Sequence, residues 1–343
     1  MIAGLACDDD NDDNDTPADD DDSDDASPAG TWPDDPKPIV GWVATSRSAE
    51  NEWGSLWQIA DGQAVPVSAP DSSPFFFGDA TVNHAWATDM YYLFSYSGNK
   101  WGIVAPEPPC AGDDTGFNFL KVELFGFSGA AISCSPTRTV LFWDNVDWKP
   151  TCTDCALYNC LESGACGVGL LNGFRKNLGI QTESAYQPLL TDVSLFPGHA
   201  SFVLQSEEVA YALTLQTADM DWWQLTHCQN GTCRIDDRIE GTIDTRYPTF
   251  LVRIDDEHTA YSGYRMGGFG YGVVVLEGYA KLIETDWPCF RWLTFAPGGS
   301  GLGIVREEGD WVLYLITGME ITRLMEFPEG EYPTGFLVAA DAY

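Results

Sequence analysis

Short apolar segments broken by Gly, Pro and Asn turns recur from about Pro38 to the end of the chain, and this recurrence most restricts the possible fold. The most regular copy covers residues 295–305, with a Pro-Gly-Gly turn, and continues through residues 310–316 and 321–325. Each segment has the length and residue types of a strand, and the turns between segments are short. The pattern predicts an all-β protein built from four-stranded units.

Six such units can be aligned on one strand each, and the spacing of these strands estimates the size of a unit. The anchor residues are Trp57, Gly102, Gly169, Ala212, Val274 and Tyr314. They lie 45, 67, 43, 62 and 40 residues apart, and the short spacings fit one four-stranded unit. We assign the two long spacings to insertions, at about 149–166 and 228–245.

Two of the units carry a Pro-Gly turn between their first two strands, at residues 195–199 and 295–299. This turn resembles the one in the TolB-like, WD40-like β-propeller repeat. The resemblance implies a single propeller over residues 31–343, with six blades, or seven if units have been merged. A large β-sandwich, or two in tandem, is the alternative fold. We expect residues 333–340 to be a first strand that closes the ring by pairing into the first blade.

The first seven residues end in Leu5-Ala6-Cys7, directly before a run of aspartates. This segment resembles the end of a bacterial lipoprotein signal peptide, which implies that Cys7 is lipidated; the alternative is an ordinary cysteine. The resemblance implies a lipid-anchored protein of the bacterial cell envelope, periplasmic or surface-exposed, that meets the membrane only through its anchor. Residues 8–30 contain no basic residue and twelve aspartates, so we expect a disordered acidic tether.

The whole chain is acidic, with 52 Asp and Glu against 17 Lys and Arg and a net charge of −35. A surface of this charge repels phosphate backbones, so the composition argues against nucleic acid as a partner.

Ten cysteines are typical of a protein that folds in an oxidising compartment. Cys228 and Cys233 flank an Asn-Gly turn, and we expect them to form a disulfide across a hairpin tip. We also expect Cys110 to pair with Cys134, which leaves Cys289 as a free thiol.

A second group of cysteines lies within the first proposed insertion and has two interpretations. Its members are Cys152, Cys155, Cys160 and Cys166. They form either two disulfides that pin a loop or a four-thiolate zinc site.

No sequence motif points to catalysis. The chain lacks a nucleophile elbow and any His-Glu-x-x-His pair. His199 and His258 occupy the same turn region in two units, so we place both at a ligand-binding rim of the disc. Acidic pairs such as Asp255–Asp256 make calcium the one cofactor that we consider; otherwise we expect none.

These observations favour a non-enzymatic, monomeric envelope or surface protein whose propeller is a rigid binding platform for a protein or a glycan. Two alternatives stay open. One is a calcium-dependent hydrolase or lactonase with its site in the central channel, which rests on fold analogy alone. The other is a structural extracellular protein without a discrete ligand.

Overall fold

The computed structural model describes residues 32–341 with short gaps. The gaps are residues 34–35, 48–52, 69–76, 82–83, 89–91, 98–99, 105–106, 110–118, 126–128, 135–137, 145, 173–174, 195–200, 216–222, 236–242, 245–249, 266–270, 278–280, 286, 289 and 297. Cys7, the expected tether at 8–30, Cys110, His199 and Cys289 therefore lie outside the described residues.

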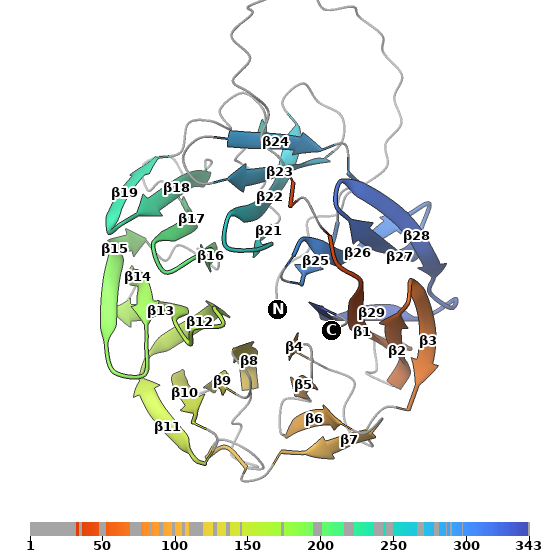
Figure 1. Ribbon diagram of the computed structural model, residues 1–343, viewed down its shortest axis with the longest axis horizontal. Helices are drawn as coiled ribbons and strands as arrows, with labels where there is room; N and C mark the ends of the chain where they lie inside the picture. The colour runs from red at the N-terminus through yellow and green to blue at the C-terminus, as the bar shows by residue number, and fades with distance from the viewer. Residues whose placement is uncertain are drawn as a thin grey trace, which may run out of the picture.

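Seven antiparallel sheets are arranged in a ring, and each is one blade (Figure 1). The innermost strands are β29 (Tyr332–Asp341), β4 (Phe77–Thr81), β8 (Phe119–Phe125), β12 (Cys155–Cys160), β16 (Ser201–Leu204), β21 (Phe250–Arg253) and β25 (Trp292–Phe295), in blades 1 to 7. Short β20 (Ile243–Asp244) pairs with the same edge of its neighbour as β21. The second strands are β1 (Ile39–Ser46), β5 (His84–Thr88), β9 (Gly129–Cys134), β13 (Cys166–Asn172), β17 (Val209–Leu215), β22 (His258–Arg265) and β26 (Ser300–Glu307).

The outer half of each blade completes the four-stranded order. The third strands are β2 (Trp53–Ala60), β6 (Leu93–Ser97), β10 (Thr139–Trp143), β14 (Arg175–Gln181), β18 (Trp223–Gln229), β23 (Tyr271–Glu277) and β27 (Asp310–Thr317). The outermost strands are β3 (Gln63–Val67), β7 (Lys100–Ile103), β11 (Trp148–Cys152), β15 (Tyr186–Ser194), β19 (Thr232–Ile235), β24 (Lys281–Thr285) and β28 (Glu320–Glu326). The chain is thus a single seven-bladed β-propeller.

The apolar core is divided among the junctions between blades. Among the described residues, a cluster of buried side chains lies at each of the seven junctions. A strand inside a blade is therefore covered on both faces, and β9 is almost wholly buried. The outermost β3 is largely exposed. This arrangement explains the high aromatic content, because wedge-shaped gaps between twisted sheets need large side chains.

The prediction of six blades is wrong, because the 67 residues between two of the anchors contain one whole blade that was assigned to an insertion. Gly102 lies on the outermost strand of blade 2, whereas Gly169 lies on the second strand of blade 4, so all of blade 3 falls between these two anchors. The segment 149–166 is no insertion, since it forms most of β11 and all of β12. The segment 228–245 likewise contains the end of β18, with β19 and β20.

The C-terminal strand closes the ring as expected. β29 pairs antiparallel with β1 from Tyr332–Ser46 to Asp341–Ile39 and supplies the innermost strand of blade 1. It also contacts β4 and β25, the innermost strands on its two sides. Just before β29, the buried Glu331 accepts hydrogen bonds from Thr45 Oγ1 (2.6 Å) and Ser55 Oγ (3.1 Å). Closure therefore combines the β29–β1 strand pair with the Glu331 carboxylate, which is hydrogen-bonded to β1 and β2.

A second closure is made by the segment before β1. The Trp32 side chain is buried between blades 6 and 7, where its Nε1 donates to the Gly299 carbonyl (3.1 Å). Its ring meets Trp287 edge-on, with the ring centroids 5.1 Å apart. Gly299 has φ +85°, and a Cβ there would lie 2.8 Å from the Trp32 ring nitrogen, so this close approach requires glycine.

Candidate functional site

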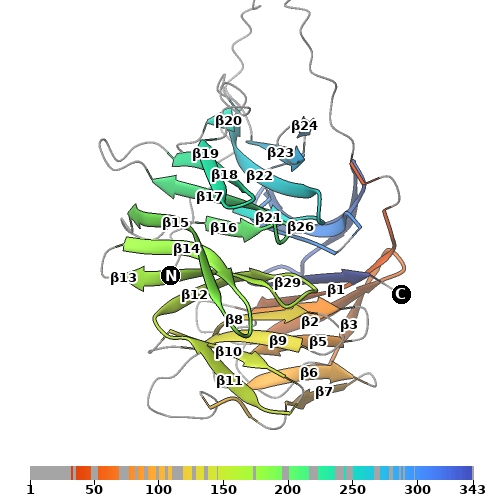
Figure 2. The ribbon, with the colours of Figure 1, turned by 60° about the vertical axis from the view of Figure 1, so that its left-hand side comes forward.

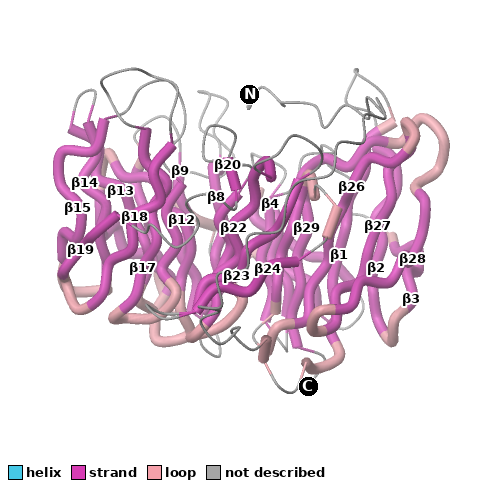
Figure 3. The backbone as a smooth tube through the Cα atoms, turned by 90° about the horizontal axis from the view of Figure 1, so that it is seen from above, coloured by secondary structure: helices cyan, strands magenta, loops and turns pink. Residues whose placement is uncertain are grey.

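The strands run between two faces of the disc, which Figure 3 shows edge-on. Because neighbouring strands are antiparallel, turns between first and second strands and turns between third and fourth strands lie on the same face. We call this the pocket face. It carries the turns at 144–147, 161–165, 182–185 and 205–208. Figure 2 brings blades 3 and 4, which bear the first three of these turns, toward the viewer.

A pocket of about 700 Å³ opens between these turns, a volume within the range typical of ligand sites. Its lining comes from blades 3 and 4, and blade 5 adds Glu207. The lining residues are Phe125, Gly129, Phe142, Trp143, Asp144, Lys149, Ser163, Gly164, Ala165, Ile180, Thr182, Glu183, Ser184, Gln187 and Glu207.

Part of the lining is apolar and comes from strand ends. Phe125 ends β8 and packs against Phe142 of β10, with ring centroids 5.6 Å apart. The Phe125 ring lies over Gly129, where a Cβ would approach it to 2.3 Å. Trp143 packs against Trp148, with ring centroids 5.3 Å apart. The rings thus hold one another in place and present a fixed apolar surface.

Charged side chains on the turns make the pocket acidic. Asp144, Glu183 and Glu207 are among the lining residues, and Lys149 is the one basic residue of the lining. Lys149 Nζ lies 2.5 Å from Asp144 Oδ2 and 3.6 Å from Glu183 Oε1, so it bridges turns of two blades. Asp144 accepts hydrogen bonds from Lys149 and from two backbone N–H groups, and these bonds lower its pKa to about 2. Asp144 is therefore ionised at any physiological pH.

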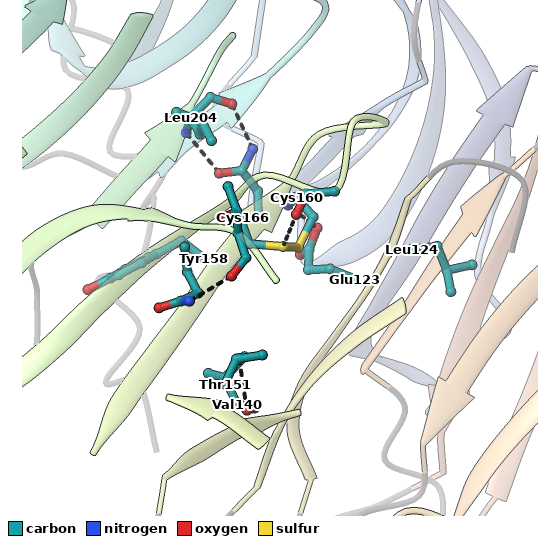
Figure 4. The surroundings of a disulfide bond; sticks show 12 residues. Glu123, Leu124, Val140, Thr151, Tyr158, Cys160, Cys166 and Leu204 are labelled. Atoms are coloured by element: carbon teal, nitrogen blue, oxygen red, sulfur yellow. Dashed lines mark hydrogen bonds between the residues drawn. A yellow bond between two sulfur atoms is a disulfide. The ribbon is translucent and has the colours of Figure 1, made fainter. Parts of the chain in front are cut away.

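A disulfide holds one wall of the pocket. Cys160 and Cys166 face each other across β12 and β13 and are bonded, so they close the turn that supplies Ser163, Gly164 and Ala165 (Figure 4). Leu161 N donates to the Ala165 carbonyl (2.8 Å) within this turn. The wall is thus constrained by covalent and hydrogen bonds before any ligand binds.

Behind this wall, side chains of the innermost strands make hydrogen bonds to the backbone of the next blade. Asp79 Oδ2 accepts from Leu124 N (2.6 Å), and Glu123 Oε2 accepts from Cys160 N (3.2 Å). Asn159 accepts from Leu204 N and donates to Leu204 O, both at 2.8 Å. Figure 4 shows Glu123, Cys160 and Leu204 along this series.

The hydrogen bonds of these three side chains form a staircase. Each side chain bonds to the backbone of the next blade, at the residue that directly follows the next side chain of the series. Leu124 follows Glu123, and Cys160 follows Asn159. The next step would fall on Val203, which has no polar side chain, so this series ends at blade 5. We call Asp79, Glu123 and Asn159 the inner staircase.

Asp79 is the most perturbed carboxyl group of the staircase. Burial and the neighbouring Glu123 charge raise its pKa to about 7, although hydrogen bonds from Leu124 and Ala80 and the Lys121 charge oppose this rise. Lys121 Nζ lies 2.8 Å from Glu123 Oε1 and also donates to the Tyr158 carbonyl. Since these groups are already paired with one another, we assign the staircase to blade packing.

The predicted rim histidine His258 is the first residue of β22 and directly follows a turn of the pocket face. Its side chain is 5% exposed, and its Nδ1 lies 2.8 Å from Asp255 Oδ1. Burial alone would raise the pKa of Asp255, but hydrogen bonds from His258 and from the Glu257 and His258 backbone lower it. His258 thus stabilises its own turn, and a role in ligand binding stays a prediction.

The cysteines of the second group are disulfide-bonded, as Cys152–Cys155 and Cys160–Cys166. The first pair lies where β11 passes to β12, so it links blades 3 and 4, and neither pair pins an insertion. The expected Cys228–Cys233 disulfide is also present.

Cys134 is disulfide-bonded, and because Cys110 lies outside the described residues, the pairing of Cys134 with Cys110 stays a prediction. Within the described ranges, no group of three or more His, Cys, Asp and Glu residues is placed to hold a metal ion. No helix in this part of the chain is long and apolar enough to cross a membrane.

No protein-family model matches the chain, and no curated protein matches it. Solved structures do. YCF48 bound to D1 peptide is 9% identical, with 88% of this chain and 96% of that chain covered and a TM-score of 0.51. The β-propeller domain of the Trilobed protease from Pyrococcus furiosus is 11% identical, with 73% and 84% covered and a TM-score of 0.53.

Two further solved structures also match the chain. A putative 6-phosphogluconolactonase from Bacteroides uniformis is 9% identical, with 88% of this chain and 98% of that chain covered and a TM-score of 0.50. TolB from Acinetobacter baumannii is 11% identical, with 90% and 67% covered and a TM-score of 0.49. At these identities the matches with TM-scores of 0.50 to 0.53 show the β-propeller fold and nothing finer.

Proposed function

We propose that the chain is a binding protein whose pocket between blades 3 and 4 takes a short, positively charged segment of a protein partner. The observation that carries this proposal is an aromatic surface beside three carboxylates in one pocket. Such a pocket suits a peptide that alternates basic and apolar side chains. YCF48 bound to D1 peptide offers a precedent for peptide binding by a propeller, at the level of the fold.

The same pocket favours a peptide over a glycan. Its three carboxylates attract the basic side chains of a peptide, whereas a neutral sugar carries no charge to pair with them. The disulfides are consistent with an exported protein, and a lipid anchor at Cys7 would hold it at the envelope. The lactonase alternative is not favoured, because the described residues offer no cluster of metal ligands.

The test is the binding of a fluorescein-labelled peptide, Gly-Arg-Leu-Arg-Phe-Arg-Gly, followed by fluorescence anisotropy at physiological salt. The variant is Glu183→Lys with Glu207→Lys, which reverses two exposed charges of the pocket. We expect its affinity to fall about tenfold or more, because like charges repel the peptide at the site.

A chain of net charge −35 attracts any cationic peptide, so the control must carry the same change elsewhere. Glu308→Lys with Glu329→Lys meets this need, since both residues are exposed on turns of the opposite face. This control should bind within about twofold of the wild type, because distant surface charges are screened. Equal losses in both double variants would show general charge attraction and contradict a pocket site.

A further inference from the structure

Lys149 occupies a position in the pocket that a ligand cation would need. Its ammonium lies between Asp144 of the β10–β11 turn and Glu183 of the β14–β15 turn. These two acids come from neighbouring blades, and Lys149 joins them. The site proposed above is therefore filled, at its most acidic point, by a cation of the protein itself.

The Asp144 carboxylate keeps its orientation without Lys149. Asp144 Oδ1 accepts hydrogen bonds from Val146 N (3.0 Å) and Asp147 N (2.8 Å), and Oδ2 is the atom that meets Lys149. The first two bonds belong to the turn itself, so a second cation could take the place of Lys149 at Oδ2 without rebuilding the turn.

Lys149 is held weakly enough to be displaced. Half of its side chain is exposed (51%), the Glu183 side chain is 68% exposed and the Asp144 side chain is 28% exposed. The pair with Glu183 is weak, because water screens it and both side chains lose rotamer freedom, and water also reaches the Lys149 end of the pair with Asp144. A ligand that also buries apolar surface against the half-buried Phe125 and Trp143 would outcompete Lys149.

We propose that Lys149 is a built-in competitor that the ligand displaces, and that the preferred ligand carries arginine at this position. This inference rests on the proposed function. A guanidinium is planar and presents several N–H donors in a fixed fork, so it can meet carboxylates on two sides at once. An ammonium is a compact point charge and lacks this geometry.

The experiment compares Lys149→Met with Lys100→Met, using the peptide named above. Methionine keeps an unbranched stem without the charge. Lys100 begins β7 on the pocket face, is exposed and lies outside the pocket, so its variant reports the same change in net charge. Lys149→Met should bind about tenfold more tightly than the wild type, and Lys100→Met within about twofold.

Two changes in the peptide test the preference for arginine. Citrulline in place of arginine keeps the shape without the charge, and lysine keeps the charge without the fork. Both peptides should bind Lys149→Met at least about fivefold more weakly than the arginine peptide does. Thermal denaturation of each variant checks that the fold is intact.

The possible outcomes distinguish a failure of this inference from a failure of the proposed function. If the wild type binds and loses affinity only on Glu183/Glu207 reversal, but Lys149→Met binds no more tightly than Lys100→Met, displacement of Lys149 is overturned and the pocket stands. If lysine and arginine peptides bind Lys149→Met equally, the arginine preference is overturned. If no variant distinguishes the pocket from the opposite face, the proposed function and this inference both fail.

Discussion

Asp79 is a residue whose protonation makes stability depend on pH. Its pKa is about 7 in the folded protein, above the usual value near 3.8, so the folded state keeps a proton that the unfolded chain loses. The resulting stabilisation is complete below about pH 4 and is lost as the pH rises toward about 7. Each pKa unit corresponds to about 1.4 kcal/mol.

We predict that Glu123→Gln weakens this pH dependence, because it removes the negative charge that helps to raise the Asp79 pKa. The measurement is the difference in Tm between pH 5 and pH 8, which should be smaller in the variant than in the wild type. Glu329→Gln, at an exposed turn, serves as the control and should follow the wild type. A Glu123→Gln profile parallel to the wild type would contradict this role of Glu123.

Trp32 is the second residue with a large expected effect. Trp32→Ala should destabilise the protein by about 3–5 kcal/mol, because it leaves a cavity between blades 6 and 7. Trp32→Phe keeps most of the ring and loses the bond to Gly299, so it should cost about 1 kcal/mol beyond the change in packing. Urea unfolding measures both. An alanine variant within about 0.5 kcal/mol of the wild type would show that Trp32 adds little to closure.

At the scale of elements, the inner staircase couples neighbouring blades through the backbone of their innermost strands. We predict that Asn159→Asp destabilises the protein by about 1–3 kcal/mol, because a carboxylate cannot donate to Leu204 O and places a negative charge against it. Asn230→Asp is the matched control, since Asn230 is exposed in a turn at φ +50°, which aspartate also tolerates. Equal unfolding midpoints in urea for the two variants would refute the staircase.

For the whole molecule, stability depends on closing the ring. Removal of residues 332–343 deletes β29 and leaves the edge of β1 unpaired. We predict that this truncation loses the cooperative thermal transition and associates, because an unpaired edge is a template for another strand. Calorimetry and sedimentation velocity measure the two effects. A monomeric truncated protein with a wild-type Tm would show that the ring holds without its C-terminal strand.

The sequence by itself determined the all-β class, the closing strand and the Cys228–Cys233 hairpin. These properties depend on local patterns: the length and residue types of a strand, turn residues, and two cysteines around an Asn-Gly turn. The pairing of residues 333–340 with the first blade followed because a ring built from blades of four strands must close.

The number of blades and the pocket were decided only by the tertiary structure. The strands resemble one another in length and residue types, so the sequence pattern does not say which strand of a blade carries Gly169. The misassigned segment 149–166 contains Lys149 and the Cys160–Cys166 turn, which are parts of the pocket. Asp144 and Glu183 lie on turns of different blades, and only the packing of blade 3 against blade 4 brings them to one ammonium group.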